Sequence, residues 1–139
     1  MKKILLVEDN EMNRDMLSRR LMRKGYDVVL ADSGTQGVEM AFSGSPDLVL
    51  MDMNLPDIDG WEATRQIRKR ETDQLQKRGK ERAKDSKKVQ RLPIIAVTAH
   101  AMSMDFKKAI DAGCDQYEPK PIQFASLLEK INTLLGVDE

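Results

Sequence analysis

The chain has 139 residues, and its 23 basic side chains balance its 23 acidic ones, which predicts one domain whose net charge favours neither acidic nor basic partners. A single cysteine, Cys114, excludes an internal disulfide, indicates a reducing compartment and is expected to be a small, partly buried apolar residue. No apolar run is long enough to cross a membrane or to form a secretory signal, so we expect a cytoplasmic protein without membrane contact.

Strand-like and helix-like segments alternate along the chain. The strands are short apolar runs bounded by turn residues, and the helices carry apolar residues at helical spacing. Asn10 is a suitable cap for the first helix, and Met12, Met16, Leu17 and Leu21 predict its buried face. The predicted strands cover residues 4–7, 26–31, 48–52, 93–97 and 115–118, and the predicted helices cover residues 11–24, 34–42, 61–70, 102–112 and 124–135.

The central predicted strand determines the fold class. Residues 48–51 are all apolar and lead into Asp52, which predicts a strand buried on both faces of a parallel sheet. Five strands alternating with five helices indicate an α/β fold with a doubly wound parallel sheet, for which the simplest strand order is 2-1-3-4-5. Ligands bind such sheets at the carboxyl ends of the strands, where Asp52 stands. A lone aspartate would more often cap a helix or begin a turn, but other strand ends supply partners for this one.

Polar residues at the ends of the other strands are expected beside Asp52. In this strand order Glu8 and Asp9 come from the neighbouring first strand, and Thr98 and Lys120 end the fourth and fifth. Crowded carboxylates repel one another and attract a cation, and oxygen ligands without histidine or cysteine favour Mg²⁺ over zinc. A Mg²⁺ beside a carboxylate, a hydroxyl and a lysine suits phosphoryl transfer, with Asp52 attacking phosphorus. Because no nucleotide-binding loop is present, the donor must be another protein or a small phosphodonor.

These residues stand in an ordered set of motifs. The set resembles the receiver domain of two-component response regulators, which has a flavodoxin-like fold with five helices. The resemblance covers nearly the whole chain, 1–139, as a single receiver domain, with residues 71–91 as an atypical insertion. The motifs are Glu8-Asp9, Asp52-x-Asn54-x-Pro56-x-x-x-Gly60, Thr98-Ala99 and Lys120-Pro121.

The resemblance implies roles for the acidic residues of the set and for two residues beside them. Asp52 would accept a phosphoryl group from a phosphohistidine on a sensor histidine kinase or histidine phosphotransfer protein. Glu8, Asp9, Asp52 and the backbone carbonyl of Asn54 would hold Mg²⁺, with Mn²⁺ as an alternative. Asn54 and His100, each two residues beyond a residue of the set, would line the path of the hydrolytic water and tune the lifetime of the phosphoryl group.

The resemblance also implies a conformational switch. Thr98, Ala99 and Lys120 would bind the phosphoryl oxygens, and the Lys120-Pro121 bond, which is cis in many relatives, would aim the lysine at the acceptor. Thr98 would move toward the phosphoryl group and make room for Tyr117 to rotate. The alternative for Tyr117 is a half-buried strand tyrosine with no switching role. A downstream protein would bind the face formed by the fourth helix, fifth strand and fifth helix.

Two other functions compete with this interpretation. A haloacid-dehalogenase-type phosphatase also forms an aspartyl phosphate, but it needs an acid two residues after the nucleophile, where this chain has Asn54. An interaction module that is never phosphorylated is the second alternative. The resemblance implies a protein that catalyses its own phosphorylation and slow dephosphorylation rather than a conventional enzyme. We expect a stand-alone receiver, with a receiver excised from a hybrid kinase as the alternative.

Residues 71–91 interrupt the resemblance. They contain eight lysines and arginines and four acids, a net charge of +4, so the rest of the chain carries −4. Their composition favours helix, but apolar residues are too sparse to offset the entropy of ordering the segment. We therefore expect an extension of the third helix that frays into a mobile basic loop. The segment enters the fourth strand at the end opposite Asp52. It is either a tolerated insertion or a docking arm for an acidic partner, and the lack of aromatic residues among the charges disfavours nucleic acid.

Overall fold

The computed structural model describes residues 1–81, 91–99 and 103–137, in which five strands alternate with five helices. The predicted elements are confirmed, with small shifts at their ends apart from the end of α3. The strands are β1 (Lys3–Val7), β2 (Asp27–Ala31), β3 (Leu48–Asp52), β4 (Ile94–Thr98) and β5 (Gln116–Pro119). The helices are α1 (Glu11–Arg23), α2 (Gly34–Ser43), α3 (Gly60–Glu81), α4 (Ser103–Ala112) and α5 (Phe124–Leu135).

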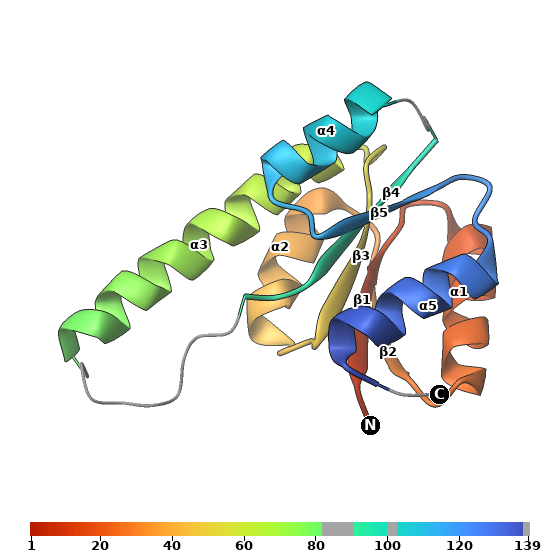
Figure 1. Cartoon of the computed structure of the whole chain (residues 1–139), viewed down its shortest axis with the longest axis horizontal. Helices are drawn as coiled ribbons and strands as arrows, with labels where there is room; N and C mark the ends of the chain where they lie inside the picture. The colour runs from red at the N-terminus through yellow and green to blue at the C-terminus, as the bar shows by residue number, and fades with distance from the viewer. Residues whose placement is uncertain (82–90, 100–102, 138–139) are drawn as a thin grey trace.

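The strands form one parallel sheet in the order β2-β1-β3-β4-β5, as the sequence predicted (Figure 1). The order reverses between β1 and β3, which are neighbours although α1, β2 and α2 separate them in sequence. The pairing of Val7 with Met51 and of Asp52 with Val97 aligns the carboxyl ends of β1, β3 and β4. Residues that follow these strands are therefore brought together at one edge of the sheet.

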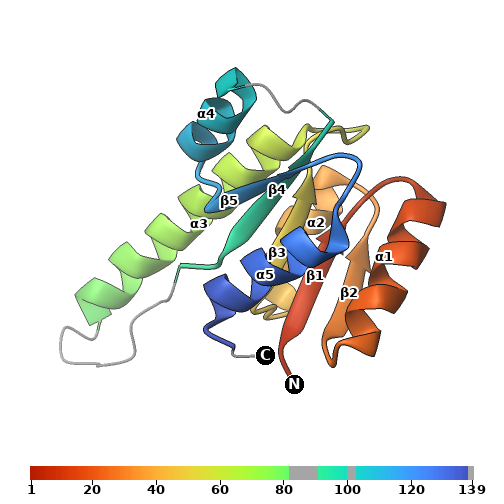
Figure 2. The ribbon, with the colours of Figure 1, turned by 45° about the vertical axis from the view of Figure 1, so that its right-hand side comes forward.

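Helices cover both faces of the sheet (Figure 2). One core cluster joins alternate strand residues such as Leu6 and Leu50 to α1 and α5, and the other joins residues such as Val7 and Met51 to α2, α3 and α4. This burial on both faces explains why the central strands consist of unbroken apolar runs. Cys114 is 3% exposed and belongs to the second cluster, so it is more deeply buried than the sequence suggested.

The predicted buried face of α1 is wrong in its first half. Leu21 is buried and Leu17 is partly buried, but Met12 and Met16 are 74% and 57% exposed. At 3.6 residues per turn the two methionines lie roughly 100–180° around the helix from the two leucines, so they cannot share one face. Ser18 is the other buried residue of α1, and its hydroxyl donates to the Asp15 carbonyl. The cap is confirmed: the Asn10 side chain accepts from the amide of Asn13 at 2.9 Å.

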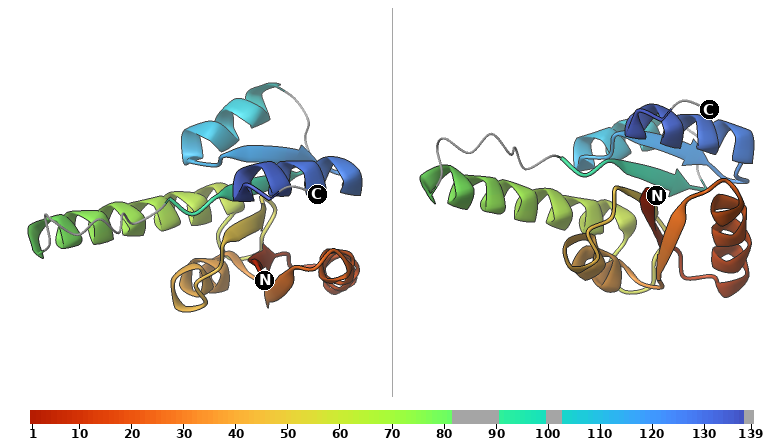
Figure 3. Two further views of the ribbon diagram at one scale, coloured as in Figure 1. Left: turned by 60° about the horizontal axis from the view of Figure 1, so that its bottom comes forward. Right: turned by 90° about the horizontal axis from the view of Figure 1, so that it is seen from below.

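Helix α3 runs past its predicted end near Arg70 and stops at Glu81. Its last turns project beyond the sheet, away from the edge where the strands end (Figure 3). The side chains of residues 72–76 are all exposed, including Leu75 at 54%. The predicted helical extension is thus present as far as Glu81, and the predicted loop that follows it, residues 82–90, lies outside the described residues.

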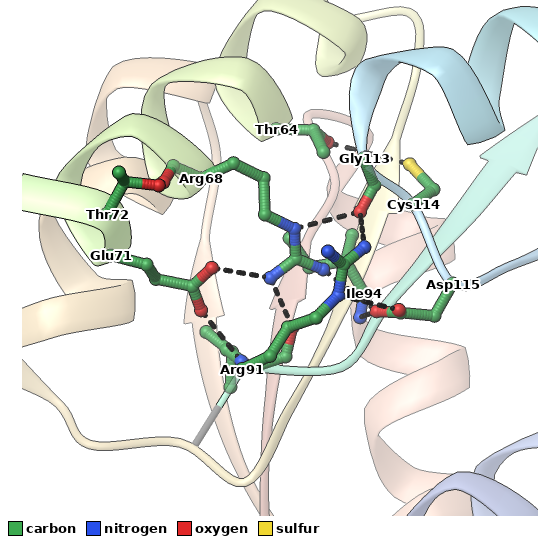
Figure 4. A network of polar contacts seen from close by, with 10 residues as sticks. Thr64, Arg68, Glu71, Thr72, Arg91, Ile94, Gly113, Cys114 and Asp115 are labelled. Atoms are coloured by element: carbon green, nitrogen blue, oxygen red, sulfur yellow. Dashed lines mark hydrogen bonds and ion pairs between the residues drawn. The ribbon is translucent and has the colours of Figure 1, made fainter. Parts of the chain in front are cut away.

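A polar network connects α3 with the residues that lead into β4, where the inserted segment begins and ends (Figure 4). Arg68 is its centre: Nη1 donates to the Leu92 carbonyl at 2.7 Å and to Glu71 Oε1 at 2.8 Å, and Nε donates to the Gly113 carbonyl at 2.8 Å. Nη2 binds Asp115 Oδ2, also at 2.8 Å. We call this set, completed by Arg91, the Arg68 clamp; its members are Arg68, Glu71, Arg91, Leu92, Gly113 and Asp115.

The clamp shows that the insertion begins and ends in fixed positions. The Leu92 amide donates to Glu71 Oε2, and Arg91 donates to Asp115 Oδ1 at 3.0 Å and to the Gly113 carbonyl at 2.8 Å. Glu71 lies in the predicted extension of the third helix, whereas Arg91, which was predicted to belong to the mobile basic loop, is held by Asp115 and Gly113. Among the described helices, none is both long and apolar enough to span a membrane.

Candidate functional site

Three carboxylates meet at the edge of the sheet where β1 and β3 end. Glu8 and Asp9 follow β1, and Asp52 is the last residue of β3. One oxygen from each lies within 4.8 Å of the others. Asp52 is 3% exposed and Glu8 7% exposed, whereas Asp9 faces solvent. The predicted convergence of these residues is confirmed, and it follows from the adjacency of β1 and β3.

Lys120 reaches the same cluster from the end of β5. Its Nζ lies 3.0 Å from Asp52 Oδ2 and 3.9 Å from Glu8 Oε1. The backbone amide of Lys120 donates to the Thr98 carbonyl at 2.7 Å, which ties the β5–α5 loop to the end of β4. The Lys120-Pro121 bond is cis, as the resemblance implied. The lysine therefore neutralises part of the charge that the three carboxylates bring together.

The loop after β3 is held tightly beside Asp52. The Asn54 amide donates to Asp52 Oδ1 at 2.9 Å, so each oxygen of that carboxylate has a donor. Gly60 begins α3 against the end of β3: a Cβ there would lie 2.8 Å from the Met53 Cα and closer still to the Asp52 carbonyl oxygen. Only glycine allows this approach. Asp57 accepts from the first amides of α2, which anchors the loop at its other side.

The loop after β1 is held mainly through its backbone carbonyls. Arg14, one turn into α1, donates from Nη1 to the carbonyls of Glu8 at 2.9 Å and Asp9 at 3.3 Å. The Asn10 amide donates to Glu8 Oε2 at 3.2 Å. Sequence reasoning missed Arg14. The only signal was its position in the helix that follows the acidic pair.

Burial changes the acidity of Glu8 strongly. Removal from water raises the pKa of this carboxyl from 4.5 to about 7, and a hydrogen bond and charge repulsion with Asp52 act in the same direction. The Asn10 amide and the Lys120 ammonium lower it, but less. Protonation of Glu8 near neutral pH would therefore offset part of the negative charge that the three carboxylates bring together.

The donor set fits Mg²⁺. All three side chains offer carboxylate oxygens, which are the ligands that this hard cation prefers, and the exposure of Asp9 leaves room for water or phosphate oxygens. Within the described residues no cysteine or histidine belongs to the cluster, so its chemistry does not suit zinc. The proton affinity of Glu8 is a further sign that the site is built to hold positive charge.

The structure also locates most of the remaining predicted site residues. Thr98 is buried at the end of β4, one residue beyond the partner of Asp52, with exposed Ala99 beside it. Tyr117 is partly buried in β5 and packs against the core under α4. Asn54 is exposed next to Asp52, and His100 lies outside the described residues.

Comparisons with known proteins give one consistent answer. Residues 4–132 match the family model of the response regulator receiver domain. The chain is similar to the polar-differentiation response regulator DivK of Brucella ovis, with 33% identity over 135 residues, which is 97% of each chain.

Two solved structures are similar along nearly the whole chain. One is the receiver domain of the sensor histidine kinase PA1611 from Pseudomonas aeruginosa, which has a magnesium ion in its active-site cleft; identity is 35%, the TM-score is 0.77, and 97% of this chain and 98% of that chain are covered. The other is the receiver domain of Saccharomyces cerevisiae Ssk1 with the histidine phosphotransfer protein Ypd1; identity is 34%, the TM-score is 0.81, and the coverage is 94% and 86%.

Proposed function

Because this chain belongs to the family of response regulator receiver domains, we propose that Asp52 is its phosphoryl acceptor and that the donor is a phosphohistidine on a sensor histidine kinase or histidine phosphotransfer protein. The observation that carries this proposal is the convergence of Glu8, Asp9 and Lys120 on a buried Asp52. No other described carboxylate has this set of neighbours.

The proposed reaction transfers one phosphoryl group. A carboxylate oxygen of Asp52 forms a bond to phosphorus while the bond from phosphorus to the donor imidazole nitrogen breaks, and that nitrogen keeps the electron pair. Lys120, now 3.0 Å from Asp52, would pair with a phosphoryl oxygen. Glu8, Asp9, Asp52 and the Asn54 carbonyl would hold Mg²⁺, or Mn²⁺ in its place, which when bound neutralises charge on the phosphoryl oxygens.

The response to phosphorylation is proposed to begin at Thr98. Its hydroxyl and the Ala99 amide would bind a phosphoryl oxygen, and the space left by Thr98 would admit the ring of Tyr117. The change would reach a downstream protein through the face of α4, β5 and α5. Asn54 and His100 would tune how long the phosphoryl group survives.

The donor protein is proposed to dock on α1 beside the acceptor. A groove of about 440 Å³ there is lined by Met16, Leu17, Lys120 and Ile122 among others, and Glu8 opens into it. Methionine side chains adapt to varied partner surfaces, which accounts for their exposure on this helix. The complex of the Ssk1 receiver with Ypd1 supports a partner of this class.

Two alternatives are less well supported. A phosphatase of the haloacid-dehalogenase type needs an acid at position 54, and Asn54 contributes its backbone amide to Asp52 instead. An unphosphorylated interaction module would not need Glu8, Asp9 and Lys120 at one carboxylate.

We propose that residues 1–139 form a single cytoplasmic receiver domain and that residues 71–91 are an insertion that docks an acidic partner. The basic excess of this segment supports the charge of that partner. An interaction of this kind would weaken as salt is added. It would also be lost when residues 73–90 are replaced by a short Gly-Ser link.

Labelling with acetyl phosphate tests the acceptor. Intact mass after incubation with acetyl phosphate and Mg²⁺ should show one added phosphoryl group, which chelation of the metal abolishes. Asp52→Asn should remove the label, whereas Asp27→Asn, the same change at an exposed residue on the far edge of the sheet, should keep it. Labelling of the Asp52→Asn variant would reject the assignment.

A further inference from the structure

One lysine of α5 makes three contacts with the strand that carries the proposed switch residue. Lys130 Nζ donates to the Tyr117 carbonyl at 2.7 Å and to Glu118 Oε1 at 2.8 Å, and it lies 5.6 Å from the centre of the Tyr117 ring. The Ser126 hydroxyl donates to the same Glu118 oxygen at 3.1 Å. We call Lys130, Glu118 and their contacts with Tyr117 the Lys130 brace.

The brace contains a charge that stability alone does not explain. Glu118 is 1% exposed, and withdrawing a carboxylate from water is expensive unless it is paired and hydrogen-bonded. Buried ion pairs of this kind are often no more stabilising than apolar side chains of similar volume. The burial of Glu118 beside an apolar core therefore indicates that its role is to hold Lys130 in a particular place.

Lys130 donates to a backbone carbonyl on the outer edge of the sheet, where no further strand among the described residues pairs with β5. β5 is an edge strand, so carbonyls on its outer side have no neighbouring strand to donate to them. Lys130 supplies the donor for the Tyr117 carbonyl from outside the sheet, and Glu118 with Ser126 fixes where the ammonium stands. The backbone of Tyr117 is thereby tied to α5 while its side chain packs against the core cluster that includes residues of α2, α3 and α4.

We propose that Lys130 is a positioning residue that holds Tyr117 in its unphosphorylated position, and that Glu118 is buried in order to hold Lys130 there. This inference rests on the proposed function, in which Tyr117 responds to a phosphoryl group at Asp52. A contact made in only one of two states shifts the equilibrium toward that state. Loss of the brace therefore releases Tyr117 toward its activated position without phosphorylation, which makes α5 a second point of control over the switch.

Fluorine NMR of the protein labelled with 3-fluorotyrosine tests the inference. The chain has two tyrosines, so Tyr26 serves as an internal reference and Tyr117→Phe assigns the signals. Mg²⁺ with beryllofluoride replaces the phosphoryl group and moves the Tyr117 signal of the wild type. In Lys130→Met without beryllofluoride, the Tyr117 signal should already be displaced by about a third or more of that separation.

Four further variants separate the brace from general effects. Lys130→Arg should restore the wild-type position, Glu118→Gln should reproduce the displacement, and Lys69→Met, an exposed lysine on α3, should change nothing. Because a lone Glu118 could prevent folding, the double variant Glu118→Leu/Lys130→Met replaces both charges by apolar groups. It should fold and still show the displaced signal.

Each outcome has a distinct meaning. Suppose that beryllofluoride binds but the Tyr117 signal does not move in folded Lys130→Met or in the double variant. The proposed role of Lys130 is then rejected, while the proposed acceptor site is retained. If the wild type gives no bound beryllofluoride signal and Tyr117 does not respond, the proposed acceptor fails, and the brace fails with it as part of a switch.

Discussion

Lowering the pH from 8 to 6 should weaken Mg²⁺ binding about tenfold. The carboxyl of Glu8 has a pKa raised to about 7 by burial and by Asp52, and a protonated carboxyl cannot coordinate the cation. Its ionised fraction is about nine-tenths at pH 8 and about one-tenth at pH 6, so the apparent Kd rises roughly tenfold over this range. Binding at pH 7 should release about half a proton per ion from this group.

Isothermal titration calorimetry measures both quantities, the second by comparing buffers with different ionisation enthalpies. Glu8→Gln should bind Mg²⁺ weakly at every pH, without the tenfold change. A wild-type Kd that varies by less than twofold between pH 8 and 6 would refute the role of burial at Glu8.

The same raised pKa has a consequence for the metal-free protein. Because the folded-state pKa lies above the unfolded value of 4.5, the protonated form of Glu8 favours folding. This contribution is complete below pH 4.5 and is lost as the pH rises through 7. The difference in unfolding free energy between wild type and Glu8→Gln, measured by urea denaturation, should therefore shift in favour of the variant as pH rises, and the shift should disappear with saturating Mg²⁺.

Three substitutions test the frame around the site by urea denaturation. Gly60→Ala should lower the unfolding free energy by about 3 kcal/mol and reduce labelling, because the added Cβ would overlap the Asp52 carbonyl; an unchanged midpoint would contradict the close approach. Arg68→Met should cost about 2 kcal/mol, since it removes the side-chain donor to the partly buried Leu92 carbonyl and leaves the Gly113 carbonyl and Asp115 with Arg91 as their remaining side-chain donor; a loss under about 1 kcal/mol would show the clamp to be incidental. Replacing residues 73–90 with a Gly-Ser link should change stability by less than about 1 kcal/mol, because the clamp stays intact and loop length has a small entropic effect; unfolding would show that the insertion supports the core.

The sequence predicted the parts of the fold that local chemistry determines. Residues 48–51 predicted a strand buried on both faces, and the alternation of elements then placed Asp52 beside the acidic pair after β1. The same strand order placed Lys120 at this edge, and the resemblance implied the cis bond before Pro121. These features depend on neighbours in sequence or on the one strand order that the alternation favours.

Features that depend on packing were not predictable. The methionines of α1 lie on a different side of the helix from Leu17 and Leu21, so the sequence offers two apolar sides and only the docked helix shows which of them faces the sheet. The extension of α3 was predicted without a defined end, because its last turns carry polar residues with good helix propensity and no apolar repeat. Glu118 reads as a surface residue, and its burial follows from a lysine twelve positions away in α5. Arg68 and Asp115 are 47 residues apart and meet only in the folded chain.

The Arg68 clamp has a practical consequence for protein engineering. The chain leaves the receiver body at Glu71 and returns at Leu92, and these two residues are hydrogen-bonded to each other. The segment between Glu71 and Leu92 therefore begins and ends at one fixed place on the domain. Its length and sequence can change with little effect on the rest of the fold. A fluorescent reporter or a foreign recognition module grafted between residues 73 and 90 would therefore be carried at the pole opposite Asp52, where it would mark or recruit the protein while its acceptor chemistry continues unaltered.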